Sequence, residues 1–311
     1  MNMSLIKGEI FLTLTAIIWG TSFVSQKLGM DYLEPFTFGA ARFLLGALIL
    51  IPIIIYLDKK EKTNDNKAET KSNYKNKDLV IAGLICGVAL FCGASLQQIG
   101  LIYTSAGKSA FLTTLYIVLI PIFGLFLKER INGQIWISVI LATIGLYFLS
   151  INENFTMRKG DAIVLLATVF WAIQIIVVGK YASRVNSLKL SVFQFVVAGI
   201  LSIISALIFE EPNLKTIIDC AGPILYTGIM VVGVAYTLQI IGQKTTPPTT
   251  ASIIMSTESI FAAISGALFL NEIMSLRELF GSILMFAAVI LTQVKFPERE
   301  IRDVKEVNEV N

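Results

Sequence analysis

Two ionisable side chains lie inside strongly apolar stretches, where a charge is costly. Glu258 is the only acidic residue deep within any of these stretches, nine residues into the one at 249–270, or about 13 Å along a helix axis. If this stretch crosses a membrane, an ionised carboxylate costs roughly 2.5 to 3.5 kcal/mol there, so the group should be neutral, paired or hydrated. It could carry a proton, or it could be structural, protonated and hydrogen-bonded to helix backbone or Ser side chains.

Arg42 lies about two helical turns into the apolar stretch 36–57. Its long side chain could extend along its aliphatic stem to the lipid headgroups. Alternatively, the guanidinium pairs with an anionic group of a substrate or with Glu258. Both interpretations remain open from the sequence.

A polar face recurs in two apolar stretches. Thr15, Trp19, Ser22 and Gln26 are spaced as i, i+4, i+7 and i+11, which places them on one side of a helix. The later stretch 160–181 repeats this face with Trp171 and Gln174. Polar side chains in a spanning helix avoid lipid, so both faces should point into the bundle. They either form interhelical hydrogen bonds or line a cavity.

Further polar side chains occur in three other stretches, and the same two alternatives apply to them. A cavity lined by Trp, Tyr, Gln and Ser would stack against and hydrogen-bond a small organic solute without requiring one fixed charge, which favours a metabolite site over an ion filter. These side chains are Gln98 in 79–102; Ser105, Ser109, Thr113 and Tyr116 in and just before 106–127; and Tyr236, Gln239 and Gln243 in and just after 219–242.

The composition requires a membrane environment for these stretches. Of 311 residues, 55% are hydrophobic and 15% charged, whereas soluble domains average about 25% charged residues. Ten stretches approach the roughly 20 apolar residues that cross a bilayer, so we expect an all-α membrane protein with ten transmembrane helices. They are 8–26, 36–57, 79–102, 106–127, 133–150, 160–181, 189–209, 219–242, 249–270 and 276–294.

The chain repeats itself. Gly8 and Trp19 recur as Gly160 and Trp171 at an offset of 152 residues, and Leu96-Gln97 recurs as Leu238-Gln239 at an offset of 142. This predicts two units, 8–150 and 160–294, followed by a charged tail, 295–311. Five helices per unit is an odd number, so the second unit should enter the membrane inverted relative to the first, as in many transporters.

The positions of Lys and Arg predict the orientation. The N-terminus, alternate loops and the tail carry 18 of these residues, seven of which are Lys in the polar segment 58–78. The other side carries six. Cytoplasmic loops are enriched in Lys and Arg, so both termini should be cytoplasmic, in the plasma membrane of a prokaryote. Segment 58–78 is best interpreted as a solvated linker, and attraction of its lysines to anionic lipid is the alternative.

Several functional classes are disfavoured. A net charge of +3 offers no basic surface for nucleic acid, and no Gly-rich phosphate loop is present. With no His and only Cys86, Cys92 and Cys220, none of them in a CxxC pair, we expect no metal, disulfide framework or cofactor. The N-terminal apolar run has no cleavage site typical of a signal peptide, so we expect it to be retained as a helix.

Three segments resemble the EamA-type permeases of the drug/metabolite transporter superfamily: Trp19-Gly20, Arg42 to Leu45, and Ser256 to Glu272. The resemblance implies ten helices, an inner-membrane location, and transport, often export, of amino acids or other small metabolites. An acidic residue at the position of Glu258 is similar to the family pattern, although Ser259 stands where Pro is typical.

We therefore expect a secondary transporter of small metabolites that works by alternating access, with proton coupling as one option. A passive facilitator is the alternative, followed by a membrane receptor or an enzyme. The expected partners are a small-molecule substrate and the bilayer, and a homodimer stays open. The candidate binding residues are Trp19, Ser22, Gln98, Tyr116, Trp171, Gln174, Tyr236 and Gln239, with Glu258 and Arg42 as candidate coupling residues.

Overall fold

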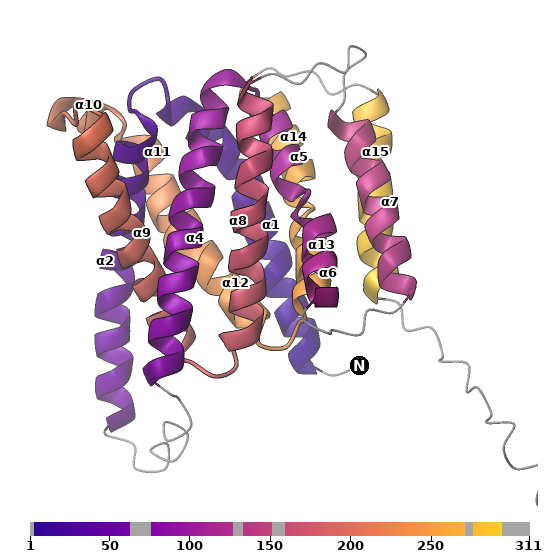
Figure 1. Cartoon of the computed structure of the whole chain (residues 1–311), viewed down its shortest axis with the longest axis horizontal. Coiled ribbons are helices and arrows are strands. Elements are labelled where there is room, and N and C mark those ends of the chain that lie inside the picture. Colours follow the sequence, from indigo (N-terminus) through magenta and orange to yellow (C-terminus); the bar gives the residue numbers. More distant parts are fainter. Residues whose placement is uncertain (1–2, 63–75, 127–132, 151–158, 271–275, 294–311) are drawn as a thin grey trace, which may run out of the picture.

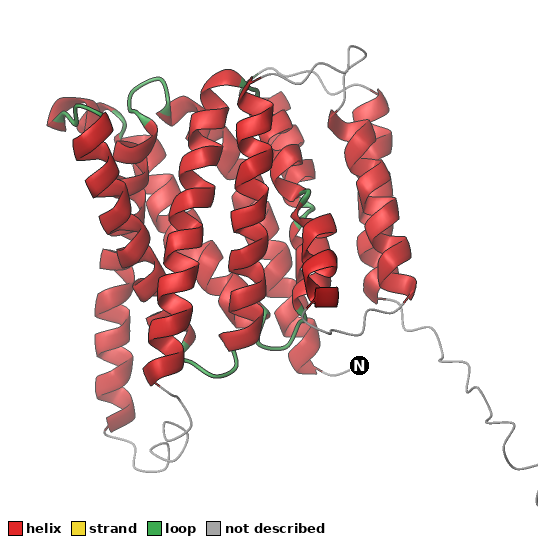
Figure 2. Ribbon diagram, in the orientation of Figure 1, coloured by secondary structure: helices red, strands yellow, loops and turns green. Residues whose placement is uncertain are grey.

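The protein is a bundle of roughly parallel helices (Figure 1). The computed structural model describes residues 3–62, 76–126, 133–150, 159–270 and 276–293, and within these ranges there is no strand (Figure 2). The predicted all-α fold is thus confirmed. The tail 295–311 and the centre of the polar segment 58–78 lie outside the described residues. The helices are α1 (Met3–Gly29), α2 (Pro35–Lys62), α4 (Asn76–Tyr103), α5 (Ala106–Thr114), α6 (Tyr116–Phe126), α7 (Gly133–Ser150), α8 (Lys159–Tyr181), α9 (Ser187–Phe209), α10 (Leu214–Asp219), α11 (Ala221–Leu225), the π-helix η2 (Tyr226–Ala235), α12 (Tyr236–Gly242), α13 (Pro248–Met255), α14 (Glu258–Phe269) and α15 (Leu276–Gln293).

Eight stretches of the described chain are long and apolar enough to cross a membrane. The remaining two predicted spans form α7 and α15, which pack against each other at one edge of the bundle (Figure 1). Their apolar cores, Gly133–Gly145 and Leu279–Leu291, are shorter than the other eight. Many large apolar side chains on the outside of the bundle are exposed, as expected where lipid is the solvent.

Three of the predicted helices are interrupted. The stretch 106–127 breaks at Leu115, between α5 and α6, and the stretch 249–270 breaks at Ser256 and Thr257, between α13 and α14. The hydroxyls of Ser256 and Thr257 donate to carbonyl oxygens three residues earlier, at 2.7 and 2.8 Å. Such bonds compete with the helical ladder. The stretch 219–242 contains η2, whose wider turns often occur at functional sites.

The two breaks occupy equivalent positions of the predicted repeats. Tyr116 and Glu258 directly follow them and are separated by the repeat offset of 142 residues. Figure 1 shows α5 above α6 but α14 above α13, so the equivalent half-helices run in opposite directions. This is the arrangement expected of inverted repeats.

Glycines allow the two predicted repeats to meet closely, and the same contact occurs twice. A Cβ atom on Gly100 of α4 would lie 3.0 Å from the carbonyl oxygen of Gly160 in α8, and one on Gly8 of α1 would lie 3.0 Å from that of Gly242 in α12. The repeat offsets convert the first pair into the second. A pseudo-two-fold axis between the repeats produces this kind of reciprocity.

We predict that Gly100→Ala destabilises the protein, because the new methyl group would overlap Val164 and crowd the Gly160 carbonyl. Overpacking of this kind costs about 1–3 kcal/mol. Gly222→Ala in α11 is the matched control, since a Cβ there meets nothing within 4 Å and Ala favours a helix. Thermal unfolding in detergent should show a lower melting temperature only for Gly100→Ala. An equal effect of both changes would contradict the close crossing.

Candidate functional site

A cavity lies at the centre of the bundle, where α1, α2, α4 and α8 meet the interrupted helices. The space open to water-sized spheres is about 30 Å³, which is room for about two water molecules. An organic solute would therefore require the surrounding helices to move apart. The lining residues are Trp19, Ser22, Phe23, Gln26, Arg42, Gln97, Thr113, Tyr116, Trp171, Ile175, Val231, Tyr236 and Glu258.

Aromatic rings form one wall of the cavity. Tyr236, at the junction of η2 and α12, lies between Trp19 and Trp171, with ring centroids 4.9 and 6.3 Å away. The indole nitrogen of Trp171 donates to Gln97 Oε1 at 3.0 Å. That of Trp19 has no hydrogen-bond partner among the described residues. The wall thus offers flat apolar faces and one unused donor.

Glu258 and Tyr116 come from different repeats and are in contact. The hydroxyl of Tyr116 donates to Glu258 Oε1 at 3.2 Å, and Glu258 is only 3% exposed. Two residues that are exchanged by a two-fold operation and also touch must lie close to its axis. The α1 backbone passes directly against α14 here, because a Cβ on Gly20 would overlap the backbone oxygen of Glu258. The acid is therefore central to the whole bundle.

Arg42 turns inward in the structure. Its side chain is 4% exposed, its Nη1 donates to Gln26 Oε1 at 2.9 Å, and the guanidinium lies over Phe38 and Phe43. The predicted alternative in which it extends to the headgroups is therefore not the conformation found here. No ion pair joins Arg42 to Glu258 among the described contacts, and Arg42 Nε has no partner there.

Gln26 and Gln97 connect these groups. Gln26 accepts hydrogen bonds from Arg42 and, at 3.3 Å, from Gln97 Nε2, and it donates to Ser22 at 2.9 Å. Gln97 accepts from Trp171 and Thr113. In the sequence Gln97 stands out only as a repeat match, and it is not among the ten predicted site residues. Its match to Gln239 was the signal that could have identified it.

Seven of the ten candidate residues line the cavity, and three do not. Gln98 points away and donates to the backbone oxygen of Gln26 at 2.9 Å. Gln174 and Gln239 exchange hydrogen bonds of 3.3 and 2.9 Å, and Gln174 also donates to Gln194. The seven that line the cavity are Trp19, Ser22, Arg42, Tyr116, Trp171, Tyr236 and Glu258.

The glutamine cluster is the repeat-related counterpart of part of the cavity wall. The offsets convert Ser22, Arg42 and Gln97 into Gln174, Gln194 and Gln239, in that order. The first set faces the cavity and carries a positive charge, whereas the second is neutral and hydrogen-bonded within itself. The site is therefore asymmetric in its side chains, although these residues occupy repeat-related positions of the sequence.

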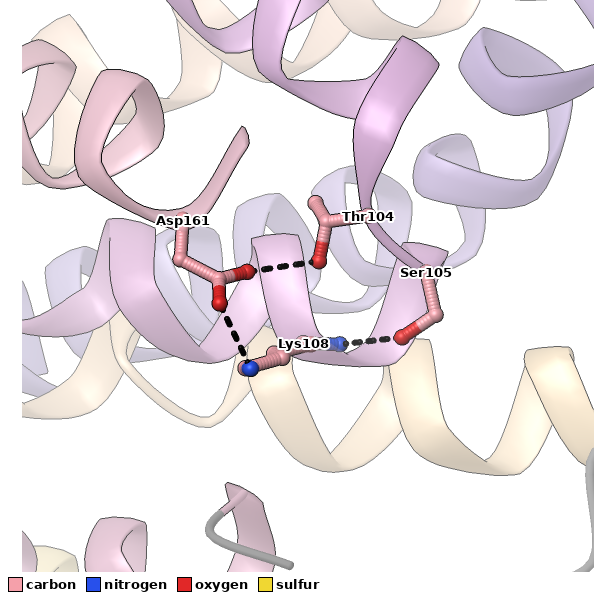
Figure 3. A network of polar contacts seen from close by, with 4 residues as sticks. All are labelled: Thr104, Ser105, Lys108 and Asp161. Atoms are coloured by element: carbon pink, nitrogen blue, oxygen red, sulfur yellow. Dashed lines mark hydrogen bonds and ion pairs between the residues drawn. The ribbon is translucent and has the colours of Figure 1, made fainter. Parts of the chain in front are cut away.

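A polar network closes the side of the bundle opposite to the N-terminus (Figure 3). Asp161, at the start of α8, forms an ion pair of 2.7 Å with Lys108 of α5 and accepts from Thr104 at 2.9 Å. Lys27 donates to the backbone oxygen of Thr104 at 3.1 Å. Together these contacts tie α1, α4, α5 and α8 at this side.

On the N-terminal side, the described residues at the repeat-related positions form no such ion pair. By the repeat offsets, Asp161 corresponds to Glu9, Thr104 to Thr246 and Lys108 to Thr250. A threonine thus replaces the lysine. Thr246 is 1% exposed and its hydroxyl has no partner among the described residues. The two ends of the bundle are therefore closed by contacts of different strength.

Comparison with known proteins agrees with this architecture. The EamA-like transporter family model matches the chain twice, over residues 6–151 and 158–294. Similar proteins are named only as uncharacterized transporters. One from Archaeoglobus fulgidus is 29% identical, covering 93% of this chain and 86% of its own length. One from Clostridium kluyveri is 26% identical, covering 97% of both. YoaV from Bacillus subtilis is 20% identical, covering 92% and 96%.

A solved crystal structure shares the fold, with a TM-score of 0.70 over 90% of this chain and 94% of that chain, at 15% identity. At this level of identity the likeness concerns the fold alone.

We predict that the cavity becomes accessible to water when the helices move. In a variant lacking Cys86, Cys92 and Cys220, Ser22→Cys should react with a small methanethiosulfonate reagent roughly tenfold faster than Ser202→Cys, because access controls thiol reactivity. Both serines are 1% exposed, but only Ser22 lines the cavity. Mass spectrometry of the labelled protein measures the two rates. Equal rates would show that the cavity does not open.

Proposed function

Because the chain belongs to the EamA-like transporter family, we propose that this membrane transporter exports a small polar or amphipathic metabolite, such as an amino acid, across the plasma membrane. The observation that carries the proposal is the central cavity, where an inward-facing arginine, a buried acid and three aromatic rings converge from both repeats. On the orientation that Lys and Arg predict, both termini are cytoplasmic. The two units are 8–150 and 160–294.

The cavity chemistry suits a solute with one anionic group and an apolar part. The guanidinium of Arg42 is a planar donor that matches a carboxylate, and its Nε and the indole nitrogen of Trp19 lack partners among the described residues. The aromatic wall supplies stacking surface. A carboxylate that binds Arg42 would replace its hydrogen bond with Gln26. Gln26 would then be free to change its contact with Gln97.

Alternating access is supported by the two closed ends and the two helix breaks. The ion pair of Lys108 with Asp161 closes the side opposite to the N-terminus, and the crossing of Gly8 with Gly242 closes the N-terminal side. Breaks at equivalent positions are natural hinges, because a few non-helical residues can absorb a change in backbone angle. Opening one end while the other stays closed moves the solute through the bundle.

In this proposal Glu258 is the proton carrier. Its position close to the axis between the repeats is one that both conformations can reach, and Tyr116 donates a hydrogen bond to its Oε1. The alternative function is a passive facilitator, in which Glu258 only stabilises the break before α14. A receptor or enzymatic role has no comparable support in the cavity.

We predict that Glu258→Gln abolishes proton-driven accumulation but retains counterflow. The amide fills the same space and cannot bind and release a proton. The solute is first identified by a thermal-shift screen of amino acids, nucleosides and vitamins, since selective binding raises the melting temperature. Proteoliposomes with a pH gradient then measure its accumulation, and Glu211→Gln, an exposed acid beyond the end of α9, is the control. If Glu258→Gln accumulates the solute as the wild type does, Glu258 is not the proton carrier, and if the wild type itself shows no accumulation driven by the pH gradient, the protein is a facilitator.

We predict that Asp161→Asn shifts the protein toward a conformation open opposite to the N-terminus. Removing one partner of the ion pair with Lys108 weakens the closed state at that side. The readout is Ser22→Cys labelling by a membrane-impermeant reagent applied from that side of reconstituted vesicles. The labelling rate should rise about fivefold, which corresponds to a loss of about 1 kcal/mol from the closed state. Asp219→Asn, an exposed change at the same side, should leave it unchanged. An unchanged rate in Asp161→Asn would remove this ion pair from the gate.

A further inference from the structure

A second and much larger hollow lies on the outside of the bundle. The space open to water-sized spheres is about 480 Å³, against about 30 Å³ in the central cavity. Its walls come from α2, α4 and α9, and we call it the α2–α9 groove. The lining residues are Ile51, Ile54, Ile55, Asp58, Leu79, Lys189, Val192, Phe193, Val196 and Val197.

Helix packing explains why the groove exists. α9 packs against both α2 and α4, whereas α2 and α4 contact each other far less. Gly83 and Gly87 bring α4 close to α9, because a Cβ on either glycine would overlap Phe193 or Val197. With α4 held against α9, the C-terminal half of α2 forms the other wall of the open groove.

The groove runs along α2 and α9 and is polar only at one end. Seven residues separate Ile51 from Asp58 and Val196 from Lys189, so its walls extend about 10 Å inward from the polar end. Between these levels every lining side chain is hydrocarbon. Asp58 and Lys189 form an ion pair of 2.9 Å at the mouth, on the N-terminal side of the bundle. This layout matches the boundary between headgroups and acyl chains.

The mouth carries excess positive charge. Lys59 and Lys60 follow Asp58 and are exposed, and exposed Lys77 lies two residues before Leu79. Lys189 and Asp58 are themselves 38% and 33% exposed, and ion pairs this accessible to solvent add little stability. A phosphate can therefore compete with Asp58 for Lys189. Lysines at this level attract anionic lipid.

We propose that the α2–α9 groove binds one anionic phospholipid, with an acyl chain along the apolar walls and the phosphate at Lys189. The hydrocarbon walls offer no polar group that would orient a metabolite, so the groove is distinct from the central cavity. Opening toward the bilayer, it is filled from the leaflet on the N-terminal side. The proposal depends on the membrane fold and is independent of the transported solute.

The test is the thermal stability of the full chain in a neutral detergent with added lipid. Phosphatidylglycerol should raise the melting temperature by at least about 3 °C more than phosphatidylcholine with the same acyl chains. Val196→Trp fills the groove and should abolish this difference. Val88→Trp, at a lipid-facing position of α4 that is 46% exposed and outside the groove, is the matched control and should retain it.

A second variant tests the charge at the mouth separately from the shape of the α2–α9 groove. The double change Asp58→Asn with Lys189→Gln keeps the groove open but removes the lysine that would bind the phosphate together with its ion-pair partner, so the preference for phosphatidylglycerol over phosphatidylcholine should shrink to the weaker attraction of Lys59, Lys60 and Lys77. Native mass spectrometry should show fewer bound lipids in both groove variants than in Val88→Trp. The proposal is wrong if the two lipids act equally on the wild type or if Val196→Trp keeps the preference. It is also wrong if Val196→Trp instead dissociates a dimer with its lipid content unchanged, since the groove would then be an interface between copies.

Discussion

The hydrogen bond between Tyr116 and Glu258 is the contact on which the centre of this protein depends. A carboxyl group in a medium of low dielectric constant requires a partner, and here the partner comes from the equivalent position of the other repeat. Both helices are interrupted directly before the residues that meet, at Leu115 and at Ser256 and Thr257. The cavity lies beside these breaks, and α1 passes close to α14 at Gly20.

The repeats supply similar backbones but different chemistry. Where one repeat has Ser22, Arg42 and Gln97 facing the cavity, the other has three glutamines bonded to one another. An uncharged cluster in which only Gln194 Nε2 lacks a partner among the described residues packs the second half, while the first half keeps a guanidinium and the indole nitrogen of Trp19 with unpartnered donors. Duplication therefore produced the symmetry of the fold, and divergence at a few positions concentrated the charge on one side of the axis.

Most of the fold was predictable from the sequence, because spanning helices need long apolar runs and Lys and Arg bias their ends. The inward face of α1 was also predictable, since the 3.6-residue period places Trp19 and Ser22 together. The breaks were not, because Ser256 and Thr257 are compatible with a continuous helix until tertiary contacts favour their alternative hydrogen bonds. Gln97 and Gln98 point about 100° apart on one helix, and only the rotation of α4 within the bundle decides which faces the cavity. Arg42 was ambiguous because its stem can follow either direction.

The glycine crossings of α1 with α12 and of α4 with α8 have a kinetic consequence. Helices joined by interdigitated side chains must disengage them before tilting, which adds to the activation barrier. At Gly8 and Gly242, and again at Gly100 and Gly160, the missing side chain lets each glycine approach a carbonyl oxygen of the other helix, so fewer side chains must disengage there when the helices tilt. Close approach of two helices at these crossings therefore leaves them more freedom to tilt than an interface of interlocked side chains would.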